Sequence, residues 1–276
     1  MWIKKSEISQ LSEQIRKAID GQEVDTRDNK EGVLSILKND IYTLIHMEKE
    51  QRYVIGQEKE KQAEFLEDIS HQLKTPITSL MLMTNLLEDA PQEKRKQFLF
   101  QMKKELAHME WMVSTLLKIA KLDSGAVSFC PVQVSSEEML HEALKTLEIL
   151  MDIKNQSVDI RNQITLTCDK KWTIEALSNL LKNALECSKE HSTILVECGE
   201  NPIYQWISIT DAREGISKEQ IAHLFQRFEN SQNENGYGIG LPLALAIIRK
   251  QDGDIEVLPG GNGRGATFTI KFFSSK

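Results

Sequence analysis

Two stretches of the chain place apolar residues at alternating steps of three and four, the spacing of amphipathic helices that pack against a neighbour. The first stretch covers residues 66–87 and the second residues 99–120, with the turn signal Asp89-Ala90-Pro91 between them. Gly125 follows the second stretch, where a helix is expected to end. The pattern therefore predicts an antiparallel helical hairpin. Because each helix of a lone hairpin buries one side only, we expect two copies to form a dimeric four-helix bundle.

A weaker amphipathic pattern precedes the hairpin. Leu34, Leu37, Ile41 and Leu44 recur at steps of three and four, whereas the rest of the chain up to about Gln62 is mostly polar and charged. Two interpretations stay open for this segment: a helix that pairs with a partner copy, and a solvated linker helix.

The pattern changes again beyond about residue 128. Strand-like runs at 193–197, 204–210, 254–258 and 266–272 alternate with helical patterns at 137–151, 172–188, 218–225 and 241–251. This predicts helices laid on one sheet. The fold class expected for the whole chain is multidomain, α and α+β: a helical hairpin in a dimeric bundle, followed by an α/β sandwich. The predicted boundaries are 1–62, 63–127 and 128–276.

Composition narrows the possible partners. The chain has 276 residues, 40% of them hydrophobic, and a net charge of −7, so a nucleic acid is not expected as a partner, because phosphate backbones require a basic surface. The four cysteines lie far apart without a C-x-x-C pair, which indicates neither a zinc site nor a disulfide framework. No stretch reaches the ~20 apolar residues that span a bilayer, and no signal peptide is present. These features favour a reduced, cytosolic protein.

His71 lies inside the first hairpin helix, in the sequence DISHQLKTPITSL. It is two residues from both Ile69 and Leu73, so its side chain should point roughly 200° away from each, toward solvent. Pro76 follows within the same helix, where it removes a backbone donor and favours a kink. A neutral imidazole is a competent nucleophile, so an exposed histidine beside a hinge is a candidate site. The alternative is a surface histidine with no chemical role.

Three polar features of the last predicted domain suggest a phosphate ligand. Asn179 and Asn183 lie four apart on one helix, where two carboxamides can bind a magnesium–phosphate group. Asp211 follows a strand and precedes Gly215, and a carboxylate there can accept a hydrogen bond from the amino group of adenine. Three glycines, Gly236, Gly238 and Gly240, open a helix whose N-terminus can bind phosphate. Each feature alone also fits an ordinary helix face or loop.

Taken together, these motifs resemble a known family. The sequence around His71 is similar to the phosphoacceptor box of two-component sensor histidine kinases, and the later motifs resemble the ATP-binding domain that these kinases share with gyrase-type ATPases and related chaperones. The resemblance covers about residue 64 to the C-terminus. It implies that His71 takes the γ-phosphoryl group of ATP and passes it to an aspartate of a response regulator. It also implies that Thr75 orients the water that dephosphorylates the regulator, and that Gln72 occupies the position of the general base.

The resemblance implies roles for the residues of the ATP-binding domain as well, with ATP and Mg²⁺ as cofactors. Asn183 would bind Mg²⁺ with help from Asn179, and Asp211 would recognise adenine with Gly215. The residues expected at the phosphates, the mobile lid or the adenine are Gly236, Gly238, Gly240, Arg227, Thr267 and the phenylalanine pair Phe225 and Phe228.

Several positions depart from the family pattern. Gln72 stands where an acidic residue is usual, and an amide cannot take up a proton. Glu186 and Cys187 replace a lysine and a tyrosine. Glu186 would repel a triphosphate unless its side chain turns to solvent or Lys182 or Lys189 compensates. Arg213 replaces a glycine, an unfavourable exchange wherever the backbone needs a positive φ. These departures bear on nucleotide affinity and kinase strength.

The sequence thus predicts a homodimeric, ATP-dependent protein-histidine kinase with a cognate response regulator as partner. Residues 1–62 would transmit an upstream signal, and they resemble the linker found just inside the membrane in such kinases. Met1-Trp2-Ile3 followed by Lys4-Lys5 suits the cytoplasmic edge of a membrane anchor, so we expect the cytoplasmic part of a membrane-anchored sensor. Two alternatives remain: a phosphatase-biased or degenerate kinase, and a non-catalytic dimeric scaffold that binds the regulator.

Overall fold

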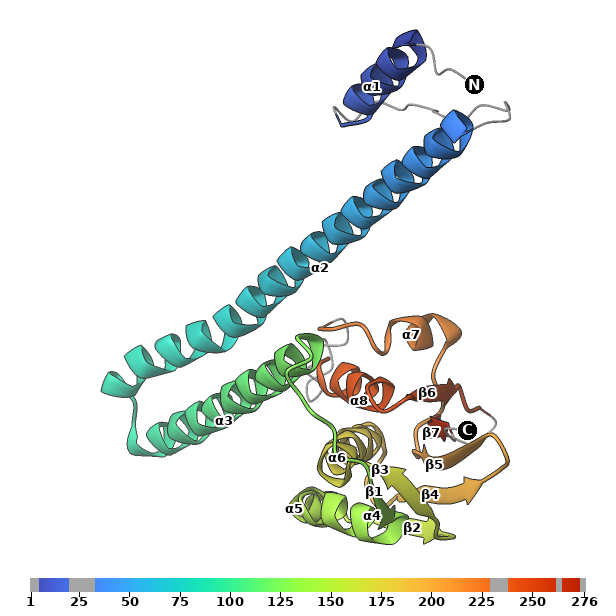
Figure 1. Cartoon of the computed structure of the whole chain (residues 1–276). Helices are drawn as coiled ribbons and strands as arrows, with labels where there is room; N and C mark the ends of the chain where they lie inside the picture. The colour runs from blue at the N-terminus through green and yellow to red at the C-terminus, as the bar shows by residue number, and fades with distance from the viewer. Residues whose placement is uncertain (1–4, 20–32, 229–237, 262–264, 274–276) are drawn as a thin grey trace. The chain divides into compact units, whose positions relative to one another are not determined.

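The computed structural model describes residues 5–19, 33–228, 238–261 and 265–273. The chain divides into two compact units, residues 1–72 and 73–276, which are described separately. The first unit holds helix α1 (Lys5–Ile19) and the part of helix α2 (Val33–Asp89) up to Gln72. The two apolar stripes at 34–44 and 66–87 therefore belong to one continuous helix of 57 residues (Figure 1). Over the ranges described, no helix is long and apolar enough to cross a membrane.

The second unit begins at Leu73, in the last part of α2, and then contains the predicted hairpin turn. Helix α2 ends at Asp89 and helix α3 (Gln92–Asp123) starts after Ala90 and Pro91, as the sequence predicts. Gly125 adopts a positive φ of 68° and its N–H donates to the Leu122 carbonyl at 3.2 Å, which confirms the glycine stop. Helix α2 continues past Pro76, so a kink at that residue stays a prediction. Apolar residues of both helices remain exposed in the single chain, among them Leu66, Ile77, Leu99, Leu106 and Val113.

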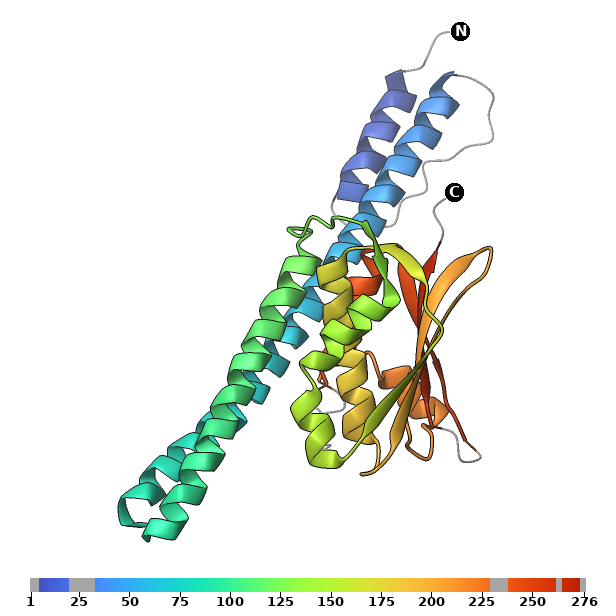
Figure 2. The ribbon, with the colours of Figure 1, turned by 90° about the horizontal axis from the view of Figure 1, so that it is seen from below.

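The rest of the second unit is a five-stranded sheet covered by helices. The strand order is β2-β4-β5-β7-β6, for Ser157–Arg161, Thr193–Glu200, Tyr204–Thr210, Thr267–Phe273 and Gly253–Leu258. Strands β2 and β4 run parallel and the other neighbours antiparallel. A separate pair joins β1 (Val132–Ser135) to β3 (Thr165–Cys168). The helices are α4 (Ser136–Lys145), α5 (Glu148–Lys154), α6 (Lys170–Cys187), α7 (Lys218–His223) and α8 (Gly240–Arg249), and Figure 2 shows α4 and α6 as a layer over the sheet.

The core lies between the sheet and helices α4, α6 and α8. Alternate residues of β4 and β7 point into it, as the period of two along a strand requires. Helix α6 packs against both α4 and α8 and buries its apolar side. The largest buried contributors from these elements include Ile194, Val196, Phe268, Ile270, Leu177, Leu180, Leu181 and Leu185. This packing holds one end of α6 against the ends of β5 and β7.

The predicted elements of this domain agree with the structure except for one divided helix and three unexpected strands. The predicted strand 204–210 matches β5 to the residue, and the other three predicted strands fall within one residue of β4, β6 and β7 at their starts. The single helix expected at 137–151 is wrong, because the chain breaks at Thr146 and Leu147 into α4 and α5. Three short strands, β1, β2 and β3, were not expected. They have only four or five residues each, and their partners lie thirty or more positions away.

Candidate nucleotide site and phosphoacceptor helix

His71 lies on helix α2 with its side chain 73% exposed, as the helix geometry predicts. Its Nε2 atom is 4.0 Å from Oε1 of Glu67, one turn earlier on the same helix. Thr75 lies one turn later and shares the same helix face. The exposed imidazole therefore has a carboxylate within reach on the turn before it.

Helix α6 carries the asparagine pair in its C-terminal half. Asp169 caps its N-terminus by accepting a hydrogen bond from the Trp172 N–H at 3.0 Å. The Asn179 amide donates to the Glu175 carbonyl at 2.8 Å, and a Cβ at Gly240 would lie 2.8 Å from Asn179 Oδ1. Glycine at position 240 thus lets the N-terminus of α8 approach α6 directly. Asn183 Oδ1 accepts a weak hydrogen bond from Cys187 Sγ at 3.7 Å.

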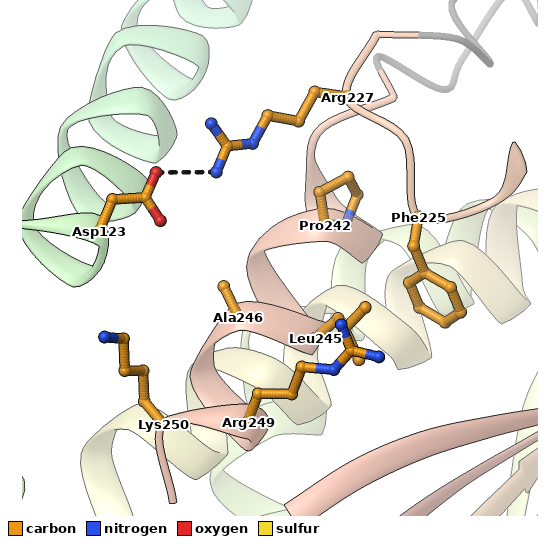
Figure 3. Close-up of a pocket in the computed structure, with 8 residues that line it drawn as sticks. All are labelled: Asp123, Phe225, Arg227, Pro242, Leu245, Ala246, Arg249 and Lys250. Carbon is orange, nitrogen blue, oxygen red and sulfur yellow. Dashed lines mark hydrogen bonds and ion pairs between the residues drawn. The ribbon is translucent and has the colours of Figure 1, made fainter. Parts of the chain in front are cut away.

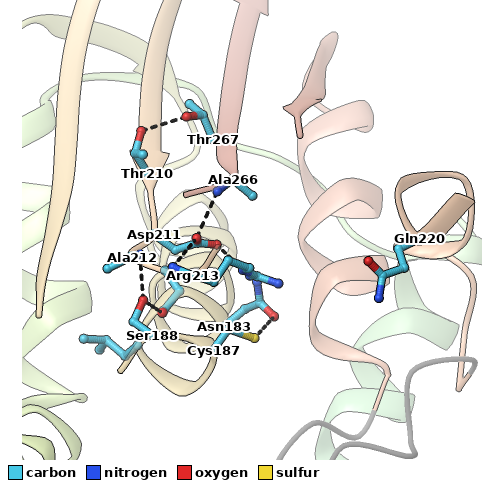
Figure 4. A network of polar contacts seen from close by, with 12 residues as sticks. Asn183, Cys187, Ser188, Thr210, Asp211, Ala212, Arg213, Gln220, Ala266 and Thr267 are labelled. Carbon is cyan, nitrogen blue, oxygen red and sulfur yellow. Dashed lines mark hydrogen bonds and ion pairs between the residues drawn. The ribbon is translucent and has the colours of Figure 1, made fainter. Parts of the chain in front are cut away.

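Asp211 follows β5 and its side chain is fully buried (Figure 4). Its Oδ1 accepts hydrogen bonds from the backbone N–H groups of Ala266 at 3.0 Å and Arg213 at 3.2 Å. Its Oδ2 accepts from Arg213 Nε at 2.5 Å. Burial raises the pKa of Asp211, while the Arg213 guanidinium and the backbone N–H groups act in the opposite direction.

Gly215 and Thr267 complete the surroundings of Asp211. Gly215 has a φ of 107°, and a Cβ there would lie 2.9 Å from the Pro259 carbonyl oxygen, so both conformation and space require glycine. The Thr267 hydroxyl is 2.9 Å from that of Thr210, one residue before Asp211. Thr267 therefore lies beside the residue that precedes Asp211, Gly215 lies against residues 259–261, and a shared binding site for the three residues stays a prediction.

The C-terminal end of α6 contacts the loop after β5. Ser188 Oγ accepts a hydrogen bond from the Ala212 N–H at 2.9 Å, and the charges of Arg213 and Asp211 both act on the Cys187 thiol. The asparagine helix and the aspartate loop thus meet at one end of the sheet. The contacts of Cys187 and of Arg213 were not foreseen, because nothing in the local sequence shows which buried groups they would face.

Of the two charged departures from the family pattern, Glu186 has one of the expected cations beside it, whereas Arg213 differs from the expectation. Lys182 Nζ lies 3.8 Å from Glu186 Oε1, whereas Lys189 pairs with Glu214 at 2.9 Å. Lys182 is therefore the compensating cation. Burial raises the pKa of Glu186, and the charges of Lys182 and Lys154 oppose that shift. Arg213 is not among the described residues with a positive φ, so the expected backbone strain at this position is wrong; the positive φ of the loop belongs to Gly215.

The glycines before α8 are described in part. Gly238 has a φ of 65°, and its carbonyl accepts a hydrogen bond from the Phe228 N–H at 2.9 Å. A Cβ at Gly238 would lie 2.8 Å from Phe228 Cα, so these two segments approach as closely as glycine allows. Phe228 is buried and Phe225 packs against the core. Gly236 lies outside the described residues.

Arg227 lines a different pocket. Its guanidinium donates to Asp123 Oδ2 at 2.8 Å, at the rim of an open pocket of about 440 Å³ (Figure 3). The remaining lining residues are Phe225, Pro242, Leu245, Ala246, Arg249 and Lys250. Asn179, Asn183 and Asp211 do not line this pocket. A role for Arg227 at the phosphates stays a prediction, and it requires the bond to Asp123 to open.

The candidate site suits a polar, oxygen-rich ligand. Two buried donors, Asn183 Nδ2 and Arg213 Nη2, have no hydrogen-bond partner within the described ranges. The same ranges hold no group of three or more histidine, cysteine, aspartate or glutamate side chains that could bind a metal by themselves. A Mg²⁺ ion here would depend on an Asn183 carboxamide oxygen and on phosphate oxygens, a ligand set that Mg²⁺ commonly has with nucleotides. The residues present therefore fit a magnesium-bound nucleotide.

Comparison with known families agrees with this geometry. The family described as histidine kinase-, DNA gyrase B-, and HSP90-like ATPase matches residues 168–276, and the His Kinase A (phospho-acceptor) domain matches residues 61–125. The chain belongs to the two-component sensor histidine kinases. Both matched ranges agree with the resemblance found in the motifs, and the second includes His71.

Individual relatives support the same assignment. The heme sensor protein HssS of Staphylococcus saprophyticus is 26% identical over 249 residues, which cover 88% of this kinase chain and 54% of HssS. The chain thus spans about half the length of the curated relatives that it matches first. Among solved structures, histidine kinase ThkA in complex with response regulator TrrA has a TM-score of 0.64 at 17% identity, covering 85% of this chain and 66% of that one. ShkA in complex with AMPPNP has a TM-score of 0.57 at 22% identity, covering 77% and 46%. At these identities the two structures show the shared fold.

Proposed function

We propose that this chain is an ATP-dependent protein-histidine kinase that phosphorylates itself on His71 and passes the phosphoryl group to an aspartate of a response regulator. The observation that carries the proposal is the meeting of four segments around one polar site: α6, the loop after β5, the start of β7 and the N-terminus of α8. The same chain carries an exposed histidine in an acceptor sequence. The complexes of ThkA with a response regulator and of ShkA with AMPPNP support the same pair of ligands for this chain.

In this proposal the residues of the ATP-binding domain bind and orient the nucleotide. Asp211 offers Oδ2 to the amino group of adenine, and Asn179 and Asn183 face the metal and the phosphates. The N-terminus of α8 contributes unpaired N–H groups, which attract phosphate. When bound, ATP supplies the γ-phosphoryl group and Mg²⁺ neutralises charge on the phosphate oxygens.

On the acceptor helix, the neutral imidazole of His71 is the nucleophile. Gln72 cannot accept a proton, so the family's usual base is replaced by an amide. Glu67 is the carboxylate that the structure records beside the ring, 4.0 Å from Nε2. We propose that it orients the imidazole and stabilises the positive charge that develops on it.

The proposal is tested by incorporation of label from γ-³²P ATP in the presence of Mg²⁺. His71→Gln should abolish labelling and leave the folded state intact. His46→Gln is a matched control, because His46 is also an exposed histidine of α2; its labelling should equal that of the wild type. Labelling that persists in His71→Gln would contradict the assignment of the acceptor.

A second candidate function is a phosphatase-biased sensor. The amide at Gln72 and the Arg213–Asp211 ion pair favour it, because both would slow phosphorylation of His71 without touching Thr75. In this case Thr75→Ala should raise the steady-state phosphorylation of the regulator, while Thr78→Ala, at an exposed threonine one turn away from Thr75, should not. Equal regulator phosphorylation in wild type and Thr75→Ala would exclude this candidate.

We also propose that the kinase acts as a homodimer. The apolar residues of α2 and α3 that remain exposed in one chain would be covered in a four-helix bundle. Residues 1–62 would then carry a signal from an upstream sensor segment, located at the cytoplasmic side of a membrane, to the bundle. A mass measurement by light scattering tests the dimer, and a monomer at micromolar concentration would contradict it.

A further inference from the structure

The carboxylate proposed to recognise adenine is already bound by an arginine of the same loop. Arg213 Nε lies 2.5 Å from Asp211 Oδ2, and the side chains are 18% and 0% exposed. The guanidinium also lies 5.9 Å from the ring centre of buried Phe268. Figure 4 shows the arginine side chain extending from the loop across the aspartate. Arg213 therefore covers Asp211 on the side of the polar site.

The hydrogen bonds of Asp211 leave one oxygen for a ligand. Oδ1 accepts from two backbone N–H groups, those of Arg213 and Ala266, which hold it in the fold. Oδ2 is the oxygen that a purine amino group would use, and Arg213 Nε occupies it. A hydrogen bond from a charged guanidinium to a carboxylate is roughly twice as strong as one from a neutral amino group. The amino group must therefore compete with a stronger internal donor.

A second pair in the same chain has the same spacing and a different setting. Asp159 and Arg161 also stand two residues apart, and Arg161 Nε lies 2.9 Å from Asp159 Oδ2. On strand β2, the Arg161 side chain is 56% exposed and the Asp159 side chain is 45% exposed. The spacing and the Nε–Oδ2 contact are thus shared, whereas Asp211 is buried and also accepts the backbone N–H of its arginine, and this burial makes Arg213 a cover for the carboxylate. Arg161 is a matched control for Arg213.

Resting on the proposed kinase function, we infer that Arg213 is the residue that limits affinity and sets base selectivity at the nucleotide site. Its guanidinium takes the acceptor that the 6-amino group of an adenine nucleotide would use, and it withdraws when the base binds. The loop does not need arginine for its shape, because its positive φ lies at Gly215. Removing the guanidinium should therefore free Oδ2 without distorting the backbone.

The test compares two nucleotides that differ only at the contested contact. ADP and purine riboside 5′-diphosphate, which lacks the 6-amino group, are titrated with Mg²⁺ into the full chain by calorimetry. Arg213→Ala should raise the affinity for ADP about tenfold, the factor expected when one charge-assisted hydrogen bond no longer competes. The affinity for the analogue should change much less, because the analogue has no donor to place on Oδ2. Arg161→Ala should match the wild type with both nucleotides.

Two further variants separate a change in selectivity from a loss of structure. Arg213→Lys keeps a cation beside Asp211 and should return the ADP affinity toward the wild-type value. Arg213→Met keeps an unbranched side chain of similar bulk without a charge or a hydrogen-bond donor and should behave as Arg213→Ala does, which provides the measurement if the alanine variant does not fold.

Each outcome bears on a different claim. Equal ADP affinities in wild type and Arg213→Ala, or equal gains for ADP and the analogue, would overturn the inference and leave the kinase proposal standing. Weaker ADP binding in Arg213→Ala would overturn it too, since the arginine would then assist the base. If no variant bound either nucleotide, ATP binding itself would fail, and with it the proposed function.

Discussion

Replacing Gly265 with alanine should disrupt the strand end that holds Asp211. A Cβ at Gly265 would overlap the carbonyl group and Oδ1 of Asp211. The backbone carbonyl cannot move aside as a flexible side chain would, so either the start of β7 or the loop after β5 must shift. That shift would break two bonds between these segments: Asp211 N–H to the Ala266 carbonyl and Ala266 N–H to Asp211 Oδ1, each 3.0 Å long.

The size of the effect follows from these contacts. Leaving a buried polar group unpaired costs about 1–3 kcal/mol, and overpacking a dense site costs about 1–3 kcal/mol. With two bonds affected and one overpacked contact, these ranges add up to a loss of about 3–9 kcal/mol in the free energy of unfolding. For a domain of about 150 residues, where 1 kcal/mol corresponds to about 2–4 °C, the melting temperature should fall on the order of 10 °C. Nucleotide binding should weaken with it, since Asp211 is displaced.

The assay is thermal unfolding followed by near-UV circular dichroism, with and without ADP and Mg²⁺. Gly56→Ala is the control, because a Cβ at Gly56 in helix α2 meets nothing within 4 Å. That variant should be unchanged or more stable by up to about 1 kcal/mol, the helix preference of alanine over glycine. If Gly265→Ala melted at the wild-type temperature and bound ADP normally, the reasoning on close approach at this position would be refuted.

Three other predictions concern charged groups. Burial, and after it the charge of Lys182, lowers the pKa of His108 below 6.5, while Glu105 acts in the opposite direction. As the pH falls, the unfolded chain therefore takes up the proton before the folded chain does, and the free energy of unfolding should decrease from pH 6.5 down through the folded-state pKa. Denaturant titration of His108→Gln should show a weaker dependence on pH. Glu67→Gln should lower the rate of autophosphorylation several-fold with an unchanged KM for ATP, and adding Gln72→Glu to this variant should restore the rate. A wild-type rate in Glu67→Gln would contradict the role proposed for that carboxylate. Lys182→Ala should weaken ADP binding, because Glu186 loses the cation 3.8 Å away, and adding Glu186→Gln should reverse the loss; calorimetry on the single and double variants decides.

The helical hairpin and the larger strands could be predicted because their signals are local. A helix or a strand repeats its apolar positions within a few residues, and the turn at Ala90 and Pro91 is encoded by those residues themselves. The short strands β1, β2 and β3 could not be predicted in the same way. A run of four or five residues shows little periodicity, and what makes it a strand is a partner brought close by the rest of the fold.

The candidate site could likewise be predicted from the sequence only in part. The types and order of Asn179, Asn183, Asp211 and Gly215 point to a nucleotide site without any coordinates, since amides, a carboxylate and glycines in that order suit a nucleotide. The sequence also shows that Arg213 and Arg161 each follow an aspartate by two residues. Only the tertiary structure distinguishes them. Ala266, more than fifty residues later in the chain, bonds the buried Asp211, and Phe268 lies against Arg213, whereas Asp159 and Arg161 stay on an exposed edge strand. An ion pair covers a binding carboxylate only where distant segments remove that carboxylate from water, and such burial is a property of packing that local sequence does not contain.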